Sequence, residues 1–451
     1  MQPKPDGRGD VMTIPALDGG FTPAAVWTAK FLENAEIPVS VAVERENGYV
    51  YKYETRIGSD RFANAFHMER LVKMLLWAAG GYRVYVSDAG MAGYIGSCYR
   101  TGGIREFDRD FMERVYERRF EVIHTDAVPE TKGSPAAVKR SLAGNRIGFD
   151  AGGSDMKVSA VKDGEVIYSE EIVWRPKTNG NPEYHYGCIR DAIAKGAARL
   201  GGKIDAIGVS SAGIYVANRA MVASLFLEVP REDFETRIKD IYVNIAHEFG
   251  APVTVANDGD VAALAGSICL KKNGVLGIAM GTSQAAGYVD DDGKITGWLN
   301  ELAFAPVDYS ADAERDEWSG DTGAGVKYFS QDAVARLAQK AGIELPEGLS
   351  PAEKLKYVQA LNEGGHAGAA RIFETIGVYF GYALAYYANF YGFSHVQVMG
   401  RVTSGAGGEA IIRMAREVLE TGYPALAKRV TIYAPDEYER RVGQSIAAAS
   451  L

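Results

Sequence analysis

Strand-like and helix-like segments alternate along the sequence after residue 145, and this alternation restricts the fold more than any other feature. Two strand-like runs, at 146–153 and 156–174, are joined by a glycine-containing turn and followed by a helical stretch at 186–201. Strands that alternate with helices predict α/β sheets covered on their faces. A second glycine-bearing strand pair begins at 274. The pattern therefore predicts an internally duplicated, two-lobed α/β body.

Length and composition indicate where the domains divide. A chain of 451 residues exceeds what one hydrophobic core usually organises. The segment 124–145 is rich in Pro, Gly, Ser and charge, so we interpret it as a linker. It separates an additional N-terminal α/β domain of unknown role, 1–123, from the lobes at 146–268 and 269–451. We expect the C-terminal helix to return to the first lobe, and the glycine-rich segment 90–103 to be a loop.

Charge and cysteine content exclude several classes of protein. The net charge of -9, with no basic patch, argues against a nucleic-acid partner. Three cysteines without paired spacing give neither a disulfide framework nor a zinc knuckle, and no secretory signal is visible, which fits a cytoplasmic protein. The apolar stretch 376–393 contains glycines, tyrosines and an asparagine. We therefore expect a helix buried between protein layers and not a membrane span.

The motif FDAGGSDMK, at the first predicted strand turn, has the composition of a phosphate-binding hairpin. Gly152 and Gly153 allow a ligand to approach the backbone, whose amides can point at phosphate oxygens, and Ser154 adds a hydroxyl donor. Asp150 would then hold a hydrated Mg²⁺ ion, because a bare carboxylate would repel the phosphates. Lys157 is either a source of positive charge or a solvated strand residue. The alternative for the whole motif is a tight turn capped by Asp150.

A second hairpin of similar composition makes the phosphate interpretation stronger. The motif AMGTSQAAGY places Gly281, Thr282 and Ser283 at the turn of the strand pair that begins at 274. Two such hairpins could clamp one polyphosphate between two lobes. Neither a Walker loop nor a dinucleotide-binding glycine fingerprint occurs in the sequence.

Between the hairpins, the motif APVTVANDGDVAALAG places Asn257 and Asp258 where a predicted strand ends and a helix begins. A carboxylate at the carboxyl end of a strand in an α/β sheet points into the crevice where ligands bind. Asp258 could accept the proton of a substrate hydroxyl that attacks a γ-phosphate. Asp260 faces differently on the helix, and we expect it to be the capping or solvated residue.

These motifs, together with AIGVSSAGIYV and NELAFAPV, occur in the order and approximate spacing of the ROK family of sugar kinases and repressors. The sequence from Arg146 to Leu451 resembles that family, which has the actin-like ATPase fold, also described as a duplicated ribonuclease H-like fold. The resemblance implies that Asp258 is the catalytic base, and that Asn257 and Glu301 bind the sugar. It also implies that the two hairpins hold MgATP.

The chain departs from the family pattern on the acceptor side. Phe304 stands where the family has a zinc-binding histidine, and Ser319 and Ala324 stand at cysteine positions, so no zinc site is expected. Val326 replaces a sugar-binding glutamate. The neighbouring Trp318 is an aromatic residue that could stack on a sugar face.

We therefore predict a cytoplasmic, ATP- and Mg²⁺-dependent carbohydrate kinase that acts on a sugar or polyol, with no nucleic-acid or membrane partner. The resemblance also suggests a homodimer. Two alternatives remain open at this point. One is a non-catalytic sugar- or nucleotide-binding protein on the same scaffold, and the other is a kinase for a polyol or another non-hexose acceptor.

Overall fold

The computed structural model describes residues 12–133, 141–435 and 437–451, so residues 134–140 of the predicted linker lie outside the described part. The first lobe is built on a five-stranded sheet with the order β11-β8-β5-β6-β7. Strands β5, β6 and β7 form an antiparallel meander, and β8 and β11 run parallel to β5. The strands are β5 (Asn145–Ala151), β6 (Asp155–Lys162), β7 (Glu165–Val173), β8 (Ala206–Ser211) and β11 (Val253–Asn257).

The second lobe has a four-stranded sheet with the order β13-β12-β14-β15. Strands β12 and β13 form an antiparallel hairpin, and β14 and β15 run parallel to β12. A single bridge between Val289 and Ile295 stands where the first lobe has its third antiparallel strand. The strands are β12 (Val275–Met280), β13 (Gln284–Val289), β14 (His395–Met399) and β15 (Thr431–Tyr433). The two lobes thus repeat one strand order, which confirms the predicted duplicated fold.

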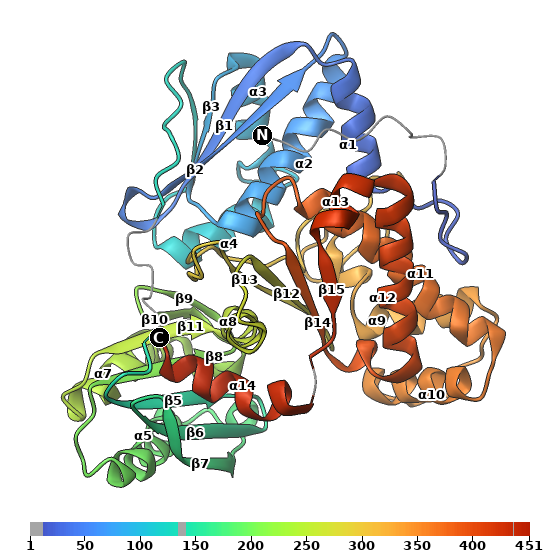
Figure 1. Cartoon of the computed structure of the whole chain (residues 1–451). Coiled ribbons are helices and arrows are strands. Elements are labelled where there is room, and N and C mark those ends of the chain that lie inside the picture. Colours follow the sequence, from blue (N-terminus) through green and yellow to red (C-terminus); the bar gives the residue numbers. More distant parts are fainter. Residues whose placement is uncertain (1–11, 134–140, 436) are drawn as a thin grey trace.

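Helices cover these sheets and connect the two lobes (Figure 1). Helix α8 contacts both β12 and β13 of the second lobe, and α14 packs across β5 and β8 of the first. Gly148 and Gly208 permit this close contact, because a Cβ atom on either would lie 1.7 Å from a backbone oxygen of α14. The helices of the two lobes are α5 (Pro182–Arg199), α6 (Arg231–Asp233), α7 (Ile241–Glu248), α8 (Asp258–Leu270), α9 (Gln331–Lys340), α10 (Pro351–Glu363), α11 (Ala367–Tyr387), α12 (Gly405–Gly422), α13 (Pro424–Arg429) and α14 (Glu437–Ala449).

Helix α11 covers most of the apolar stretch 376–393, and its residues from Ile376 to Tyr387 are all buried within the protein. Among the residues that the structure describes, no helix is long and apolar enough to cross a membrane.

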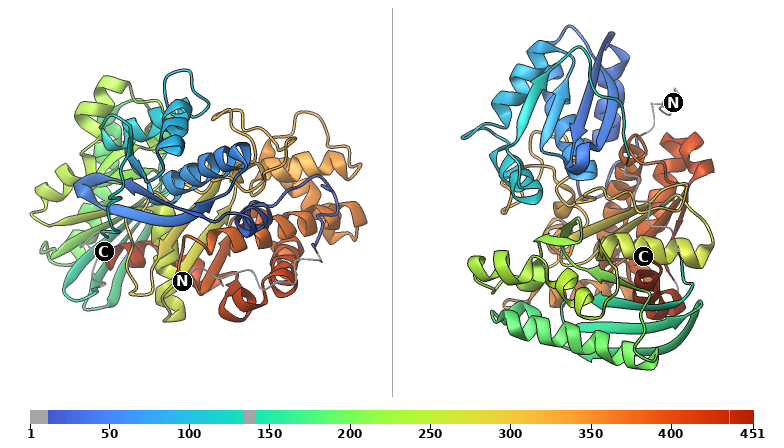
Figure 2. Two further views of the ribbon diagram at one scale, coloured as in Figure 1. Left: turned by 90° about the horizontal axis from the view of Figure 1, so that it is seen from above. Right: turned by 90° about the vertical axis from the view of Figure 1, so that its left-hand side faces the viewer.

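The N-terminal unit is a separate four-stranded sheet with the order β2-β1-β3-β4 (Figure 2). Its elements are α1 (Ala24–Glu33), β1 (Ile37–Glu44), β2 (Val50–Ile57), α2 (Arg61–Ala79), β3 (Arg83–Val86), α3 (Ala89–Cys98), α4 (Glu106–Tyr116) and β4 (Glu121–His124). Its apolar core continues into the core of the second lobe, as in the contact of the Phe21 and Tyr379 rings, whose centroids lie 4.5 Å apart. The unit is therefore packed on the second lobe and shares its interior.

The prediction of a loop at 90–103 is wrong, because most of this segment forms helix α3. The Asp88 carboxylate caps the helix by accepting a hydrogen bond of 2.8 Å from the Met91 amide. The end of the helix is held by a hydrogen bond from the Arg105 amide to the Cys98 carbonyl. Capping and tertiary contacts thus outweigh the low helix propensity of its glycines.

Candidate active site

The first glycine hairpin connects β5 and β6 and is tied to the chain that follows β7. The Trp174 indole donates a hydrogen bond of 2.8 Å to the Gly152 carbonyl, and the Trp174 amide donates one to the Ser154 carbonyl. Gly153 and Ser154 are exposed, and the Ser154 hydroxyl contacts Asp155 at 3.1 Å. The two hydrogen bonds from Trp174 therefore hold the turn in place, while its exposed tip is accessible to a ligand.

Asp150 lies at the inner end of this hairpin and is buried. Its carboxylate accepts a hydrogen bond of 2.6 Å from the Ser210 hydroxyl on β8. Burial raises the pKa of Asp150 to about 6, and the charge of Asp258 also raises it. Lys157 is paired with Asp150 in the strand register, and its ammonium group lies 3.6 Å from Glu171. Lys157 is thus a half-exposed, paired strand residue that lies beside Asp150.

Lys177 is a residue at this site that sequence reasoning missed. It belongs to a short 3-10 turn, Pro176–Thr178, directly after Trp174. A Cβ atom placed on Gly153 would lie 3.1 Å from the Lys177 Nζ atom. Lys177 is exposed and forms no ion pair or hydrogen bond with a described residue. The charge of Lys177 lowers the pKa of Asp258.

The second glycine hairpin connects β12 and β13 in the other lobe. The Gly281 amide donates to the Ser283 carbonyl, and the Gly281 carbonyl accepts from the Gln331 amide at the start of α9. Thr282 and Ser283 are exposed at its tip. The two hairpins thus occupy equivalent positions in the two lobes.

Helix α8 begins at the end of β11 and carries the predicted catalytic residues. Asn257 is the N-cap, since its side-chain oxygen accepts from the Gly259 amide at 2.7 Å, and its amide group donates to the Gly213 carbonyl. Asp258 is half-buried and accepts from the Gly259 amide at 3.0 Å. Burial raises its pKa, and the backbone hydrogen bonds and Lys177 lower it.

The expectation that Asp260 is a capping or solvated residue is wrong. Its side chain is only 5% exposed, and one carboxylate oxygen accepts hydrogen bonds from the Tyr288 amide and the Asn300 side chain. Burial raises its pKa to about 7. Asn257 already caps the helix, and Asp260 therefore points toward the second lobe and the cavity described below.

Glu301 is half-buried in the loop after β13, and the N-terminal unit holds this loop in place. The Asn300 and Glu301 amides donate hydrogen bonds of 2.9 Å to the Ala78 and Trp77 carbonyls at the end of α2. Burial raises the pKa of Glu301 to about 7, and the charges of Asp258 and Asp260 raise it further. The Asn300 side chain donates to Asp260, so the loop that carries Glu301 lies against the first turn of α8, which carries Asp258 and Asp260. The prediction did not include Asp260 among these carboxylates.

Phe304 lies in an aromatic cluster formed mostly by the N-terminal unit. Its ring centroid lies 4.4 Å from that of Trp77 and 5.2 Å from that of Trp318, and Phe107 and Phe111 surround it. Trp318 is 65% exposed and lines a separate open cleft between α4 and residues 221–239. Phe304 therefore takes part in an apolar contact between the N-terminal unit and the second lobe.

A buried network of charges fixes the neighbouring loop, which contains Trp318 and Asp321. Asp321 lies 2.7 Å from Arg105, 3.1 Å from Lys73 and 3.3 Å from Arg70. Burial alone would raise the pKa of Asp321, but these three cations hold it well below its usual range. The members, each at most 10% exposed, are Glu69, Arg70, Lys73, Arg105, Asp108 and Asp321. All except Asp321 belong to the N-terminal unit.

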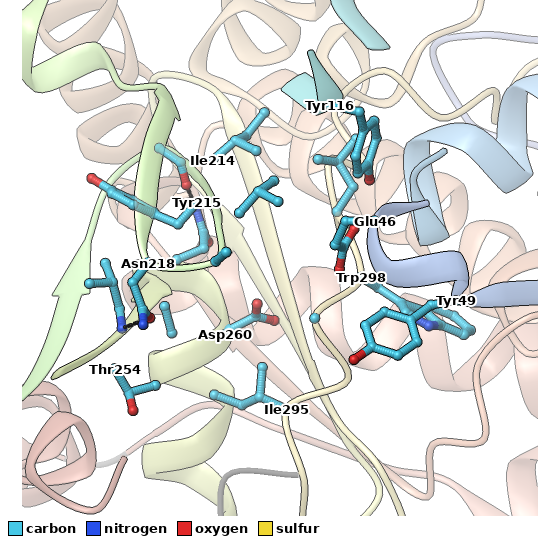
Figure 3. Close-up of a pocket in the computed structure, with 18 of the residues that line it drawn as sticks. Glu46, Tyr49, Tyr116, Ile214, Tyr215, Asn218, Thr254, Asp260, Ile295 and Trp298 are labelled. Carbon is cyan, nitrogen blue, oxygen red and sulfur yellow. Dashed lines mark hydrogen bonds between the residues drawn. The ribbon is translucent and has the colours of Figure 1, made fainter. Parts of the chain in front are cut away.

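A cavity of about 240 Å³ adjoins Asn257 on the side of the N-terminal unit (Figure 3). The N-terminal unit contributes Glu46, Tyr49 and Tyr116, and the second lobe contributes Trp298. The remaining wall comes from the β9 (Ile214–Val216) and β10 (Arg219–Val222) hairpin, from β11 and from Asp260. The N-terminal unit therefore completes a pocket that begins at one of the predicted substrate-binding residues.

Comparison with known proteins identifies the fold. No protein-family model matches the sequence, and no curated protein matches it. The structure is similar to a ROK hexokinase from Thermus thermophilus, with 16% identity, 68% of this chain and 97% of that chain covered, and a TM-score of 0.53. It is also similar to a putative N-acetylmannosamine kinase from Listeria monocytogenes, with 16% identity, 68% of this chain and 98% of that chain covered, and a TM-score of 0.50. A third similar structure is a ROK transcriptional regulator homologous to an Escherichia coli protein, with 14% identity, 68% of this chain and 78% of that chain covered, and a TM-score of 0.51. The chain thus has the ROK fold, which confirms the predicted resemblance as far as the fold is concerned.

Proposed function

We propose that the protein is an ATP-dependent kinase that phosphorylates a hydroxyl group of a sugar or sugar derivative in the cytoplasm. The observation that carries the proposal is the position of Asp258. Asp258 follows β11 directly, and the parallel register of β11, β8 and β5 brings the end of β11 to the same sheet edge as the end of β5, where the first hairpin begins. The loop that carries Glu301 is tied to the same turn of α8 by the hydrogen bond from Asn300 to Asp260. A general base for phosphoryl transfer has to lie near both the phosphates and the acceptor hydroxyl, and this position of Asp258 supports such a role.

The two hairpins would bind the ATP phosphates with exposed backbone amides and hydroxyl groups. Asp150 fits Mg²⁺ held through water, because Mg²⁺ usually keeps several waters and takes one or two carboxylates together with the substrate phosphates. When bound, Mg²⁺ would neutralise phosphate charge. Lys177 would place its ammonium group on the γ-phosphate, since it already lies against Gly153 and has no other partner among the described residues.

The chemical step requires one proton transfer and one phosphoryl transfer. The acceptor hydroxyl gives its proton to the Asp258 carboxylate as its oxygen forms a bond to the γ-phosphorus. The bond between that phosphorus and the β,γ-bridging oxygen breaks, and ADP leaves. Glu301 would orient the acceptor through its hydroxyl groups. Most of the rate enhancement would come from positioning and charge neutralisation.

The test is MgATP-dependent ADP release across a panel of hexoses, amino and N-acetylated hexoses and polyols. We expect one class of acceptor to stimulate turnover and Asp258→Asn to abolish the stimulation, with a loss of about 10² to 10⁴ in rate. The matched control is Asp292→Asn, because Asp292 is an exposed carboxylate in the β13 loop. Stimulation that persists in Asp258→Asn would contradict the proposal. The oligomeric state, for which we predict a homodimer, is measured by light scattering.

The second candidate function is non-catalytic binding of a sugar or nucleotide. Both polar ends of the Asn257 side chain are engaged within the protein, by Gly259 and Gly213, and not directed at a substrate. A regulator is also among the proteins with this fold. Binding of a sugar or of MgATP without acceptor-stimulated turnover would favour this function over the kinase.

A further inference from the structure

The cavity between the N-terminal unit and α8 has the size and lining of a site for one small ring. Its volume of about 240 Å³ lies below the roughly 300 to 1,000 Å³ of pockets that hold drug-sized ligands. Tyr49, Tyr116 and Trp298 provide aromatic faces, and Asn257 lies at its edge. Figure 3 shows Asp260 directed into the space between these rings and the β9–β10 hairpin.

The charged side chains that line this cavity have one sign. Its lining residues include two carboxylates, Glu46 and Asp260, and no Lys, Arg or His. Glu46 is compensated by Arg45, whose guanidinium lies 2.8 Å away. A ligand with a phosphate or carboxylate group would meet uncompensated negative charge here and would be repelled.

Asp260 lacks the counter-charge that Asp108 and Asp321, the buried aspartates of the charge network, have. It is 95% buried, its hydrogen-bond donors are a backbone amide and the Asn300 amide, and it forms no ion pair with a described residue. Asp321, which is buried to a similar degree, contacts three cations. The contrast is visible in the pKa of the two groups, which is raised to about 7 for Asp260 and lowered for Asp321.

We propose that this cavity binds a protonated primary amine, held by the Asp260 carboxylate and by the faces of the surrounding aromatic rings. An ammonium group supplies the missing counter-charge, and a cation over Tyr or Trp rings is further stabilised. The kinase acceptor would then be an amino-substituted sugar or aminocyclitol, bound with its ring beside Asn257. The identity of the acceptor rests on the proposed kinase function, whereas the selectivity of the cavity for an amine does not.

The experiment compares pairs of ligands that differ only in charge. Calorimetry measures the affinity of the full-length protein for glucose and for its 2-amino-, 3-amino- and 6-amino-deoxy derivatives, with N-acetylglucosamine as a neutralised amine. We expect at least one amine to bind about 10 to 100 times more tightly than glucose, as a charge-assisted hydrogen bond allows. Equal or weaker binding of all three amines would overturn the inference.

Two variants locate the effect in the cavity. Asp260→Asn retains an oxygen that can accept from Tyr288 and Asn300, so we expect the amine preference, which is the ratio of amine affinity to glucose affinity, to fall about tenfold or more. Glu46→Gln, at the rim, should reduce amine binding by a smaller factor, and it tests the site even if Asp260→Asn fails to fold. Asp292→Asn is the control. An unchanged amine preference in the folded variants would overturn the inference.

ADP release, measured in parallel, separates the two proposals. Turnover with neutral acceptors alone would overturn the assignment of an amine as the kinase acceptor and leave the kinase function intact. Amine-selective binding without turnover would remove the kinase function and leave the cavity as an amine-binding site.

Discussion

At the scale of single residues, the site is dominated by carboxylates with little positive charge nearby. Burial raises the pKa of Asp258, Asp260 and Glu301, and the charge of Asp258 raises the pKa of the other two further. Lys177 is the cation whose charge lowers the pKa of Asp258. The protonation of these groups should therefore control both catalysis and stability, in ways that differ from one carboxylate to the next.

Lys177 provides the first prediction at this scale. Lys177→Met should weaken the binding of MgATP about tenfold or more and leave MgAMP binding unchanged, because only ATP carries the phosphate that the ammonium would contact. Calorimetry with both nucleotides measures the effect. Lys157→Met is the matched control, since Lys157 is paired with Glu171 and should affect both nucleotides little. An equal loss for both nucleotides would contradict the role given to Lys177.

The pH dependence of turnover provides a second prediction. Asp258 must be ionised to accept a proton, and burial raises its pKa, so kcat/KM should fall on the acid side at a higher pH than an ordinary aspartate would give. Lys177 lowers this pKa, so the acid limb should move to higher pH in Lys177→Met. A pH–rate profile of both proteins measures the shift. An identical acid limb would mean that Lys177 is too far from Asp258 to act on it.

Asp260 provides a third prediction, on stability. Its pKa is about 7 in the folded chain and about 4 in the unfolded chain, so its contribution to stability is complete below about pH 4 and is lost as the pH rises through about 7. Asp260→Asn should therefore gain stability relative to the wild type between pH 5 and pH 8. Thermal melting at the two pH values measures the difference, which should be absent in Asp292→Asn.

The sequence predicted those site residues whose neighbours are close along the chain. The two hairpins and the strand-to-helix turn at Asp258 are local patterns, and the structure contains each of these turns at the predicted residues. Lys177 could not be found in this way, because its position against Gly153 depends on the hydrogen bonds that Trp174 makes across the hairpin. The burial of Asp260 likewise depends on Asn300 and Tyr288, which lie in another lobe.

At the scale of secondary-structure elements, the N-terminal helices α2 and α4 hold the loop at 308–324 by a buried charge network. Buried ion pairs cost desolvation energy, so they stabilise only when every member has its partners. Lys73 is fully buried and contacts both Asp108 and Asp321. It is therefore the member whose loss leaves the most uncompensated charge.

Lys73→Met should lower the free energy of unfolding by about 3 kcal/mol or more, because two buried carboxylates lose a partner. The double variant Lys73→Met/Asp108→Asn should recover part of this loss, because it removes one of the unpaired charges. Lys294→Met, in an exposed pair with Asp292, should cost less than about 1 kcal/mol. Denaturant unfolding measures all three. A loss for Lys73→Met as small as that for Lys294→Met would show that the network is not stabilising.

At the scale of the whole molecule, the predicted N-terminal domain is less independent than its separate sheet suggests. Its core continues into that of the second lobe, and α2 holds the loop that contains Glu301. It also contacts the first lobe, where Glu117, at the end of α4, lies 3.2 Å from Arg219 and also pairs with Lys239. Sequence patterns indicate individual sheets well, but they do not show which apolar faces meet.

Removal of residues 1–144 should therefore prevent folding of the rest of the chain. The truncated protein would expose the second-lobe side chains that pack on Phe21, Trp77 and their neighbours, and it would leave Asp321 without its three cations. Solubility and circular dichroism of the truncated chain measure the outcome. A soluble truncation with a cooperative melt would show that the two lobes fold on their own.

The shared core also has a consequence for the order of events during synthesis. The N-terminal unit leaves the ribosome first, but the apolar residues that complete its core, from Leu276 to Ile432, follow roughly 10 to 60 s later at about 5 to 20 residues per second. During that interval the face of α2 around Trp77 lacks its second-lobe partners, such as Phe304. The nascent chain should therefore be a substrate for chaperones that recognise exposed aromatic surface, and slower translation should lengthen its exposure to aggregation.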